Sequence, residues 1–171
     1  HESGFAVAVP PFPEDKPLNR AFERAAPDPE WLGLLNTRYV VADFPVETAG
    51  LTEERRFESV HVYRNDLALP RAFAVSRVHA VEDGERAWVL MQAMDFRREA
   101  VVEGEGTWVR DDGFSGIREA SVVLHLPNKV VTEIDLPSPA LLVLSENWYP
   151  GWTAYDNGRR IPILRTNYIL R

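Results

Sequence analysis

The sequence predicts a mainly β fold with a few short helices, in the α+β class, whose C-terminal half is an antiparallel β-sandwich or jelly-roll-like unit. From residue 117 onward, short runs rich in Val, Leu and Ile recur at roughly ten-residue spacing with turn residues between them, a pattern typical of sandwiches and barrels. Asn157-Gly158 also lies between two β-prone runs. Because Asn and Gly tolerate the positive φ of a tight hairpin, this dipeptide predicts a hairpin turn.

The 171 residues are predicted to form an extended lead-in, 1–27, and a single β-rich domain, 28–171. The beginning of the lead-in is dense in proline, which disfavours a packed element; these prolines are Pro10, Pro11, Pro13 and Pro17. A sub-division of the domain into 28–100 and 101–171 stays open. His1 follows no methionine and the chain closes on an expected strand, so we expect a piece excised from a longer protein.

Local signals predict short elements in the first half of the domain. Asp28, Pro29 and Glu30 indicate a helix start, since they supply a capping side chain, a proline in the first turn and an acid near the helix N-terminus. Apolar residues at three- and four-residue spacing predict a second short helix over 85–95. The other expected elements of this half are a strand over 38–42, a polar loop over 45–56, a strand from 60 that ends at 64–66, and a strand over 72–81.

The second half of the domain is dominated by β signals. Glycine-containing polar stretches predict loops at 104–106 and 111–113. The expected strands lie at 122–124, 130–134, 140–144, 152–155 and 161–164.

The composition excludes several classes of protein. The formal net charge is −7, whereas a nucleic-acid footprint requires clustered basic residues, so no nucleic-acid partner is expected. The absence of cysteine excludes disulfides, zinc-thiolate sites and thiol nucleophiles. The apolar runs are far shorter than the roughly 18 residues of a membrane-spanning helix.

No metal, cofactor or catalytic residue is predicted. The four histidines lie far apart, without metal-ligand spacing to one another or to a carboxylate pair; they are His1, His61, His79 and His125. Asp111-Asp112-Gly113 indicates a turn, because the alternating acids of a calcium loop do not follow. The chain has no G-x-S-x-G elbow, glycine-rich phosphate loop or dinucleotide fingerprint. Glycosidase chemistry needs only two facing carboxylates, an alternative that the 26 acidic residues leave open without indicating a pair.

The segment 145–158 holds the one candidate recognition site. Trp148, Tyr149 and Tyr155 are candidate glycan contacts, because exposed aromatic faces stack on sugar rings. The alternative, which we favour because Trp and Tyr are usually well buried in small β domains, is that the rings close one end of a sandwich. Trp152 is predicted to be buried, with Trp148 or Tyr149 at the surface. The structural motif that sets these rings comprises Pro150, Gly151, Trp152, Asn157 and Gly158.

Three blocks of this sequence resemble one family. Residues 35–41, LNTRYVV, resemble the block "lgvkYvv", and residues 62–73, with VYRN and LPRAF, resemble "vyrN..alPRaf.v". The third and most specific block, 142–168, holds YPGW, DNG, IPI and NY, and resembles "LvlsdtyyPGW.a.vdG..vpi..any". In this order and spacing the blocks resemble the C-terminal extracytoplasmic region of the bacterial YfhO-like membrane proteins, which are multi-spanning and of the glycosyltransferase C type. The resemblance covers residues 31–171.

This resemblance implies a parent protein that uses a lipid-linked sugar to glycosylate cell-surface polymers. The catalytic carboxylate of that family would lie in an extracytoplasmic loop between membrane helices, which this chain lacks, so no catalytic residue transfers to it. For this chain the resemblance implies a location at the extracytoplasmic face of a bacterial cell membrane. It also implies the membrane-embedded remainder of the same protein as a partner.

Our first hypothesis is therefore a non-catalytic, extracytoplasmic accessory domain of a membrane glycosyltransferase-like protein that contacts a glycan or cell-surface polymer acceptor. The alternatives are a purely structural domain packed on the membrane part, and a glycan-processing enzyme. An exposed, coplanar aromatic platform near Trp148 and Trp152 would favour the first hypothesis, and complete burial of those rings the second. Two carboxylates about 5–10 Å apart across a cleft would favour the third.

Overall fold

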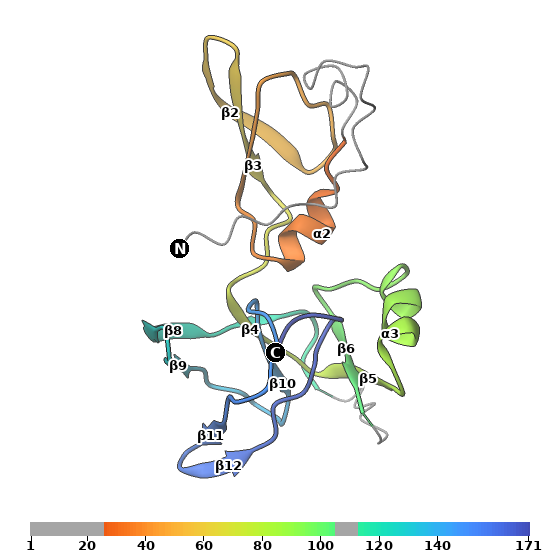
Figure 1. Cartoon of the computed structure of the whole chain (residues 1–171), viewed down its shortest axis with the longest axis vertical. Helices are drawn as coiled ribbons and strands as arrows, with labels where there is room; N and C mark the ends of the chain where they lie inside the picture. The colour runs from red at the N-terminus through yellow and green to blue at the C-terminus, as the bar shows by residue number, and fades with distance from the viewer. Residues whose placement is uncertain (1–25, 105–112) are drawn as a thin grey trace.

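The computed structural model describes residues 26–104 and 113–171 (Figure 1). It confirms the predicted fold class, because the described residues are mainly β with two short helices, and every strand pair but one is antiparallel. The described part forms two lobes, an upper lobe of residues 29–65 and a lower lobe of residues 72–104 and 113–171. The lead-in predicted over 1–27 lies almost wholly outside the described residues, as do Asp111 and Asp112 of the predicted turn.

The upper lobe combines helix α2 (Pro29–Leu34) with a three-stranded sheet of order β1-β3-β2. The helix start is confirmed: Asp28 Oδ1 accepts hydrogen bonds from the backbone N–H of Glu30 at 2.9 Å and of Trp31 at 3.3 Å. The strands are β1 (Tyr39–Ala42), β2 (Leu51–Phe57) and β3 (Val60–Asn65).

Strand β2 corrects the prediction of a loop over 45–56. Its residues alternate neither in hydrophobicity nor in burial, since every residue after Leu51 is exposed and four in a row are charged. It is an edge strand held by its pairing with β3, and charged exposed edges are a common way to keep a sheet from pairing with other chains. Periodicity cannot detect a strand whose two faces both meet solvent.

Polar side chains form the buried face of β3. His61, Tyr63 and Asn65 are buried, whereas Val60 is exposed. Asn65 Nδ2 donates hydrogen bonds to the carbonyls of Pro29 at 2.9 Å and Thr37 at 3.0 Å, which ties the sheet to α2. The valines of this strand therefore face outward, on the opposite side from α2.

The lower lobe contains one parallel β-α-β unit and one antiparallel sheet of order β10-β4-β7. The parallel unit is β5 (Arg77–Val81), α3 (Gly84–Met91) and β6 (Glu99–Glu103), and the sheet is β10 (Leu141–Leu144), β4 (Ala72–Val75) and β7 (Arg118–Glu119). The single strand predicted over 72–81 is wrong: the chain leaves β4 at Ser76, whose hydroxyl donates to the Phe114 carbonyl at 2.7 Å, and enters a different sheet. The helix predicted over 85–95 exists but ends at Met91.

These two sheets and α3 enclose the hydrophobic core in a sandwich-like arrangement. Phe73 and Val143 come from the antiparallel sheet, Val101 from the parallel pair and Met91 from α3, and all are buried. The central strand β4 precedes residue 117, so the sheet draws on both halves of the chain. Strand β6 spans residue 100, and both sheets pair segments far apart in the sequence.

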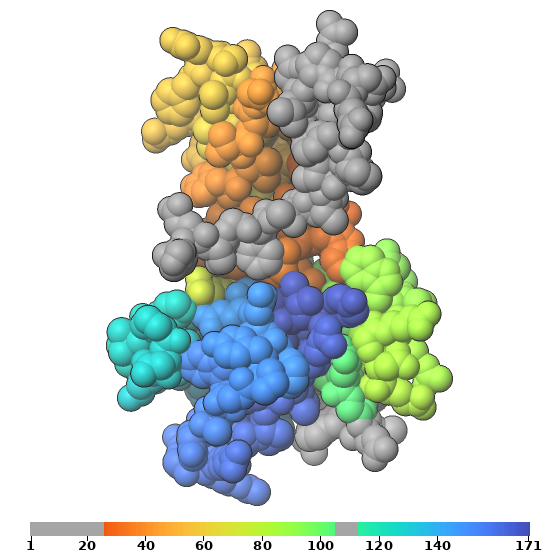
Figure 2. Space-filling view, in the orientation of Figure 1, coloured from red at the N-terminus to blue at the C-terminus, as the bar shows by residue number. Residues whose placement is uncertain are grey.

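Two antiparallel hairpins project from this core at the periphery of the lower lobe. They are β8 (Ser121–Leu126) with β9 (Lys129–Glu133), and β11 (Ala154–Asp156) with β12 (Arg159–Ile161). The predicted turn of the second hairpin is confirmed, because Asn157 and Gly158 have φ values of 48° and 82°. Figure 2 shows this hairpin, in blue, protruding from the lower edge of the molecule.

Four rings form an aromatic ladder between the lobes: Phe96, Trp31, Trp88 and Tyr168. Trp31 of α2 lies 5.3 Å from Phe96 and 5.1 Å from Trp88 of α3, measured between ring centroids. Trp88 in turn lies 5.8 Å from Tyr168, which carries the Arg165 guanidinium over its ring at 5.0 Å. Trp31 also packs against the buried core, so the ladder extends the core across the two lobes.

Neither helix in the described part of the chain has the length and apolar character needed to cross a lipid bilayer.

Candidate functional site

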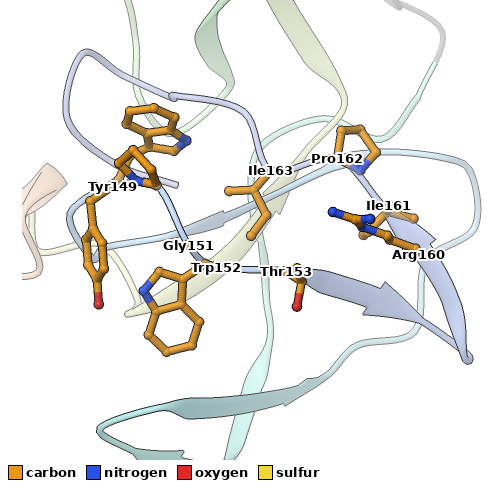
Figure 3. A pocket seen from close by; sticks show the side chains of 10 residues that line it. Tyr149, Gly151, Trp152, Thr153, Arg160, Ile161, Pro162 and Ile163 are labelled. Atoms are coloured by element: carbon orange, nitrogen blue, oxygen red, sulfur yellow. The ribbon is translucent and has the colours of Figure 1, made fainter.

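The predicted recognition segment forms one side of an open pocket, the C-terminal pocket, with a volume of about 350 Å³ (Figure 3). Strand β12 and the residues after it form the other side. Ten residues line the pocket: Trp148, Tyr149, Pro150, Gly151, Trp152, Thr153, Arg160, Ile161, Pro162 and Ile163. The pocket thus joins the YPGW and IPI motifs, which lie apart in the sequence.

Aromatic surface is available in this pocket. Tyr149 and Trp148 are 52% and 37% exposed, and Trp152 is partly buried. The rings of Tyr149 and Trp152 meet edge to face, with centroids 6.1 Å apart and planes at 72°. This is a favoured arrangement of two aromatic rings, but at this angle Tyr149 and Trp152 do not form a coplanar platform.

A glycine turn and a backbone hydrogen bond to residue 169 fix the positions of these rings. Gly151 has a φ of 106°, which a residue with a side chain rarely adopts, so the reversal after Pro150 requires glycine. The backbone N–H of Trp148 donates to the Ile169 carbonyl at 2.7 Å. The ring-bearing segment is therefore fixed to residues 166–170, which themselves pair as a short hairpin.

Tyr155 lies beside the pocket rather than in its lining. It is 64% exposed and pairs with Arg160 across the β11–β12 hairpin. Directly opposed residues share one face of an antiparallel pair, so the phenol and the guanidinium are neighbours at the pocket rim. Arg160 is the only charged residue of the lining and was not predicted. The sequence could have indicated Arg160, because a hairpin turn at 157–158 places residue 160 opposite Tyr155, which was predicted as a site residue.

A network of charged side chains lies behind the rings. Glu146 Oε1 lies 3.0 Å from Arg71 Nη2 and 2.7 Å from His125 Nε2, and its other oxygen accepts from Arg171 Nη2. The Arg171 side chain is buried, and its guanidinium carbon lies 3.9 Å from the centroid of the Trp152 ring and 5.9 Å from that of Tyr149. Sequence reasoning missed this network, because its members are dispersed from residue 71 to residue 171 and share no spacing.

The network keeps Glu146 ionised. Burial opposes ionisation, but hydrogen bonds from His125 and Arg71 and the charge of Arg171 outweigh it and hold the pKa of the Glu146 carboxyl below its ordinary value. An ionised carboxylate is therefore available to hold Arg171 against the rings at neutral pH.

The structure places the predicted site residues as follows. Trp148, Tyr149 and Tyr155 are exposed, and Pro150, Gly151 and Trp152 line the pocket, while Asn157 and Gly158 form the hairpin turn. Trp152, predicted to be buried, is only partly so, because a guanidinium and not a second sheet covers it.

The described histidines each approach a glutamate. His61 lies 3.3 Å from Glu53 and His79 lies 2.6 Å from Glu99, as His125 does with Glu146. Within residues 26–104 and 113–171, no three side chains of the metal-ligating types gather at one point.

Comparison with protein-family models, with curated proteins and with solved structures finds no match to this chain. The resemblance to the YfhO-like family therefore stays a prediction from the sequence.

Proposed function

We propose that this chain is a non-catalytic, extracytoplasmic accessory domain of a membrane glycosyltransferase-like protein, and that its C-terminal pocket contacts a glycan or cell-surface polymer. The observation that supports this proposal most directly is the exposure of Trp148 and Tyr149 at the rim of a pocket. The sequence blocks that resemble the YfhO-like family include the residues that line it.

The chemistry of the pocket suits a carbohydrate. Pyranose rings present flat, C–H-rich faces that pack on aromatic rings, and their hydroxyl oxygens accept hydrogen bonds from donors at the rim. Arg160 supplies such a donor, and Thr153 adds a hydroxyl. None of the ten lining residues is a carboxylate, so the pocket lacks the acid pair that glycosidic hydrolysis needs.

A second candidate function is a structural domain that packs on the membrane part of the parent protein. The observation that favours it is in the upper lobe. The outer face of the β1-β3-β2 sheet exposes four large apolar side chains, and clustered exposed apolar residues are typical of protein contacts; these are Tyr39, Val41, Phe57 and Val60.

Two matched tyrosine variants separate the candidates. Tyr149 and Tyr39 have nearly equal exposure, 52% and 53%, but lie in different lobes. We expect Tyr149→Ala to weaken binding on a glycan array by about tenfold, the effect of losing one stacking ring, with an unchanged melting temperature. Tyr39→Ala should leave glycan binding unchanged.

The result that overturns glycan contact is a wild-type domain that retains no glycan on the array. Equal losses from the two tyrosine variants would also contradict it, because the effect would then be independent of the pocket. The structural candidate predicts that the domain co-purifies with the membrane-spanning part of its parent protein. It would be supported if Tyr39→Ala weakened this co-purification and Tyr149→Ala did not.

A further inference from the structure

We infer that Arg171 is the positioning residue of the C-terminal pocket: held by Glu146, its guanidinium fixes Trp152 and Tyr149 in the orientation that receives a ligand. This inference rests on the proposed function. Arg171 is 8% exposed and is absent from the pocket lining, so it acts through the two rings.

The geometry places a desolvated cation against both rings. The Arg171 guanidinium carbon lies 3.9 Å from the Trp152 centroid, which is close stacking distance, and 5.9 Å from the Tyr149 centroid. Cation–π attraction strengthens when water is excluded, and tryptophan is its best aromatic partner. Among the described residues, Trp152 is not one of those that pack on the buried core, and its ring contacts are this guanidinium and the edge of Tyr149.

Glu146 determines where the guanidinium lies. It is the carboxylate that pairs with Arg171, and among the described residues Nη1 of Arg171 has no hydrogen-bond partner. The backbone is fixed as well, because the Leu144 N–H of strand β10 donates to the Arg171 carbonyl. Loss of Glu146 would leave a buried cation without its counter-charge, so the guanidinium would move toward water and release Trp152.

Arg71 provides a matched control. It pairs with the same carboxylate at 3.0 Å and its Nη2 also lies 3.1 Å from Nε2 of His125. In the part of the chain that the structure describes, the Arg71 guanidinium lies over no Trp, Tyr or Phe ring. A role confined to supporting Glu146 would give the two lysine variants the same Trp152 band. Their stabilities differ in any case, because the Arg71 side chain is 45% exposed and the Arg171 side chain 5%. A positioning role belongs to Arg171 alone.

The test compares Arg171→Lys with Arg71→Lys. Lysine preserves the charge beside Glu146 but has no planar group to stack on an indole. The first readout is the near-ultraviolet circular dichroism of the free protein, in which Trp152→Phe identifies the Trp152 band. We expect this band to disappear in Arg171→Lys and to persist in Arg71→Lys, with both proteins folded.

The second readout is the affinity for cellohexaose, a probe whose equatorial hydroxyls leave flat C–H faces on every ring. We expect Arg171→Lys to weaken binding by about tenfold, the equivalent of one desolvated cation–π contact, while Arg71→Lys stays within about twofold. Should Arg171→Lys fail to fold, the double variant Arg171→Met, Glu146→Gln removes both charges and leaves neither unpaired. It should show the same loss of the Trp152 band.

The possible results separate the positioning role of Arg171 from the proposed function. An unchanged Trp152 band in Arg171→Lys, or an equal change in Arg71→Lys, overturns the positioning role. A wild-type protein that binds neither cellohexaose nor any glycan on the array overturns the proposed function. In that case a band lost only in Arg171→Lys still supports ring orientation by Arg171.

Discussion

The aromatic ladder and the C-terminal pocket contain the same kinds of side chain in different surroundings. In the ladder, Trp31 contacts two other rings and packs on the buried core. In the pocket, Trp152 contacts the Tyr149 ring and the Arg171 guanidinium, and within the described ranges it is not one of the residues that pack on the buried core. Both clusters include an arginine over an aromatic ring. From this difference in packing we expect the ladder rings to contribute more to the free energy of unfolding than the pocket rings do.

The largest expected difference between the two clusters is in the free energy of unfolding. Trp31→Ala should lower it by about 3 kcal/mol, because it removes a large ring that packs on the core and breaks the link between the lobes. Trp148→Ala, at an exposed ring of the pocket, should lower it by less than about 1 kcal/mol. Urea unfolding of both variants measures the difference. Equal losses would mean that the pocket rings are part of the core.

Two asparagines with left-handed backbone extend the comparison. Asn167, next to the ladder residue Tyr168, and Asn157, in the pocket hairpin, have φ values of 46° and 48°. Asn167 is buried, and its Oδ1 accepts from the Val101 N–H at 3.0 Å, whereas Asn157 is exposed. Alanine should cost about 1 kcal/mol at Asn157, chiefly for backbone strain, because the hydrogen bond that its Nδ2 donates to Asp156 at 3.2 Å is exposed to solvent. At Asn167 it should cost about 3 kcal/mol, because the Val101 N–H also loses its partner.

Thermal unfolding of the two asparagine variants checks this expectation. The backbone term is common to both positions, so the difference between them reports the buried hydrogen bond. A cost at Asn157 equal to or above that at Asn167 would contradict the structure at the ladder end.

These elements also show what local sequence signals can determine. The capped start of α2 and the turn at Asn157-Gly158 each depend on adjacent residues, and both were predicted. Strand β2 was missed because it is exposed on both faces, and β6 because its parallel pairing with β5 depends on a distant segment. The candidate site likewise has one part that the sequence predicts and one part that it does not. The pocket rings form one motif, whereas the Glu146 network joins residues that only the fold brings together.

The carboxylate of Glu146, which lies behind the pocket rings, should make the stability of the folded protein depend on pH. Because the folded-state pKa of Glu146 lies below its ordinary value of 4.5, ionised Glu146 stabilises the folded protein at neutral pH, and this contribution is lost as the pH falls through the folded-state pKa. The Glu146→Gln variant lacks this titration. Its deficit in melting temperature relative to wild type should therefore be largest at pH 7 and shrink on acidification.

Melting curves of wild type and Glu146→Gln from pH 7 to the acid limit of folding test this linkage. Other carboxyl groups with lowered pKa values, Glu53, Asp66 and Glu99, titrate in both proteins and cancel in the difference. A deficit that stays constant over this range would show that Glu146 contributes nothing through its charge.

The smallest expected effect concerns the hairpin that brings Arg160 to the pocket rim. Gly158 has a φ of 82°, and a Cβ at this position would meet no atom within 4 Å. Gly158→Ala should therefore destabilise the protein by about 1 kcal/mol through backbone strain alone. Because this hairpin lies outside the Arg171 contact, the Trp152 band should be unchanged, while glycan binding falls only as far as Arg160 is displaced. A lost Trp152 band in Gly158→Ala would show instead that the hairpin, and not Arg171, orients the indole.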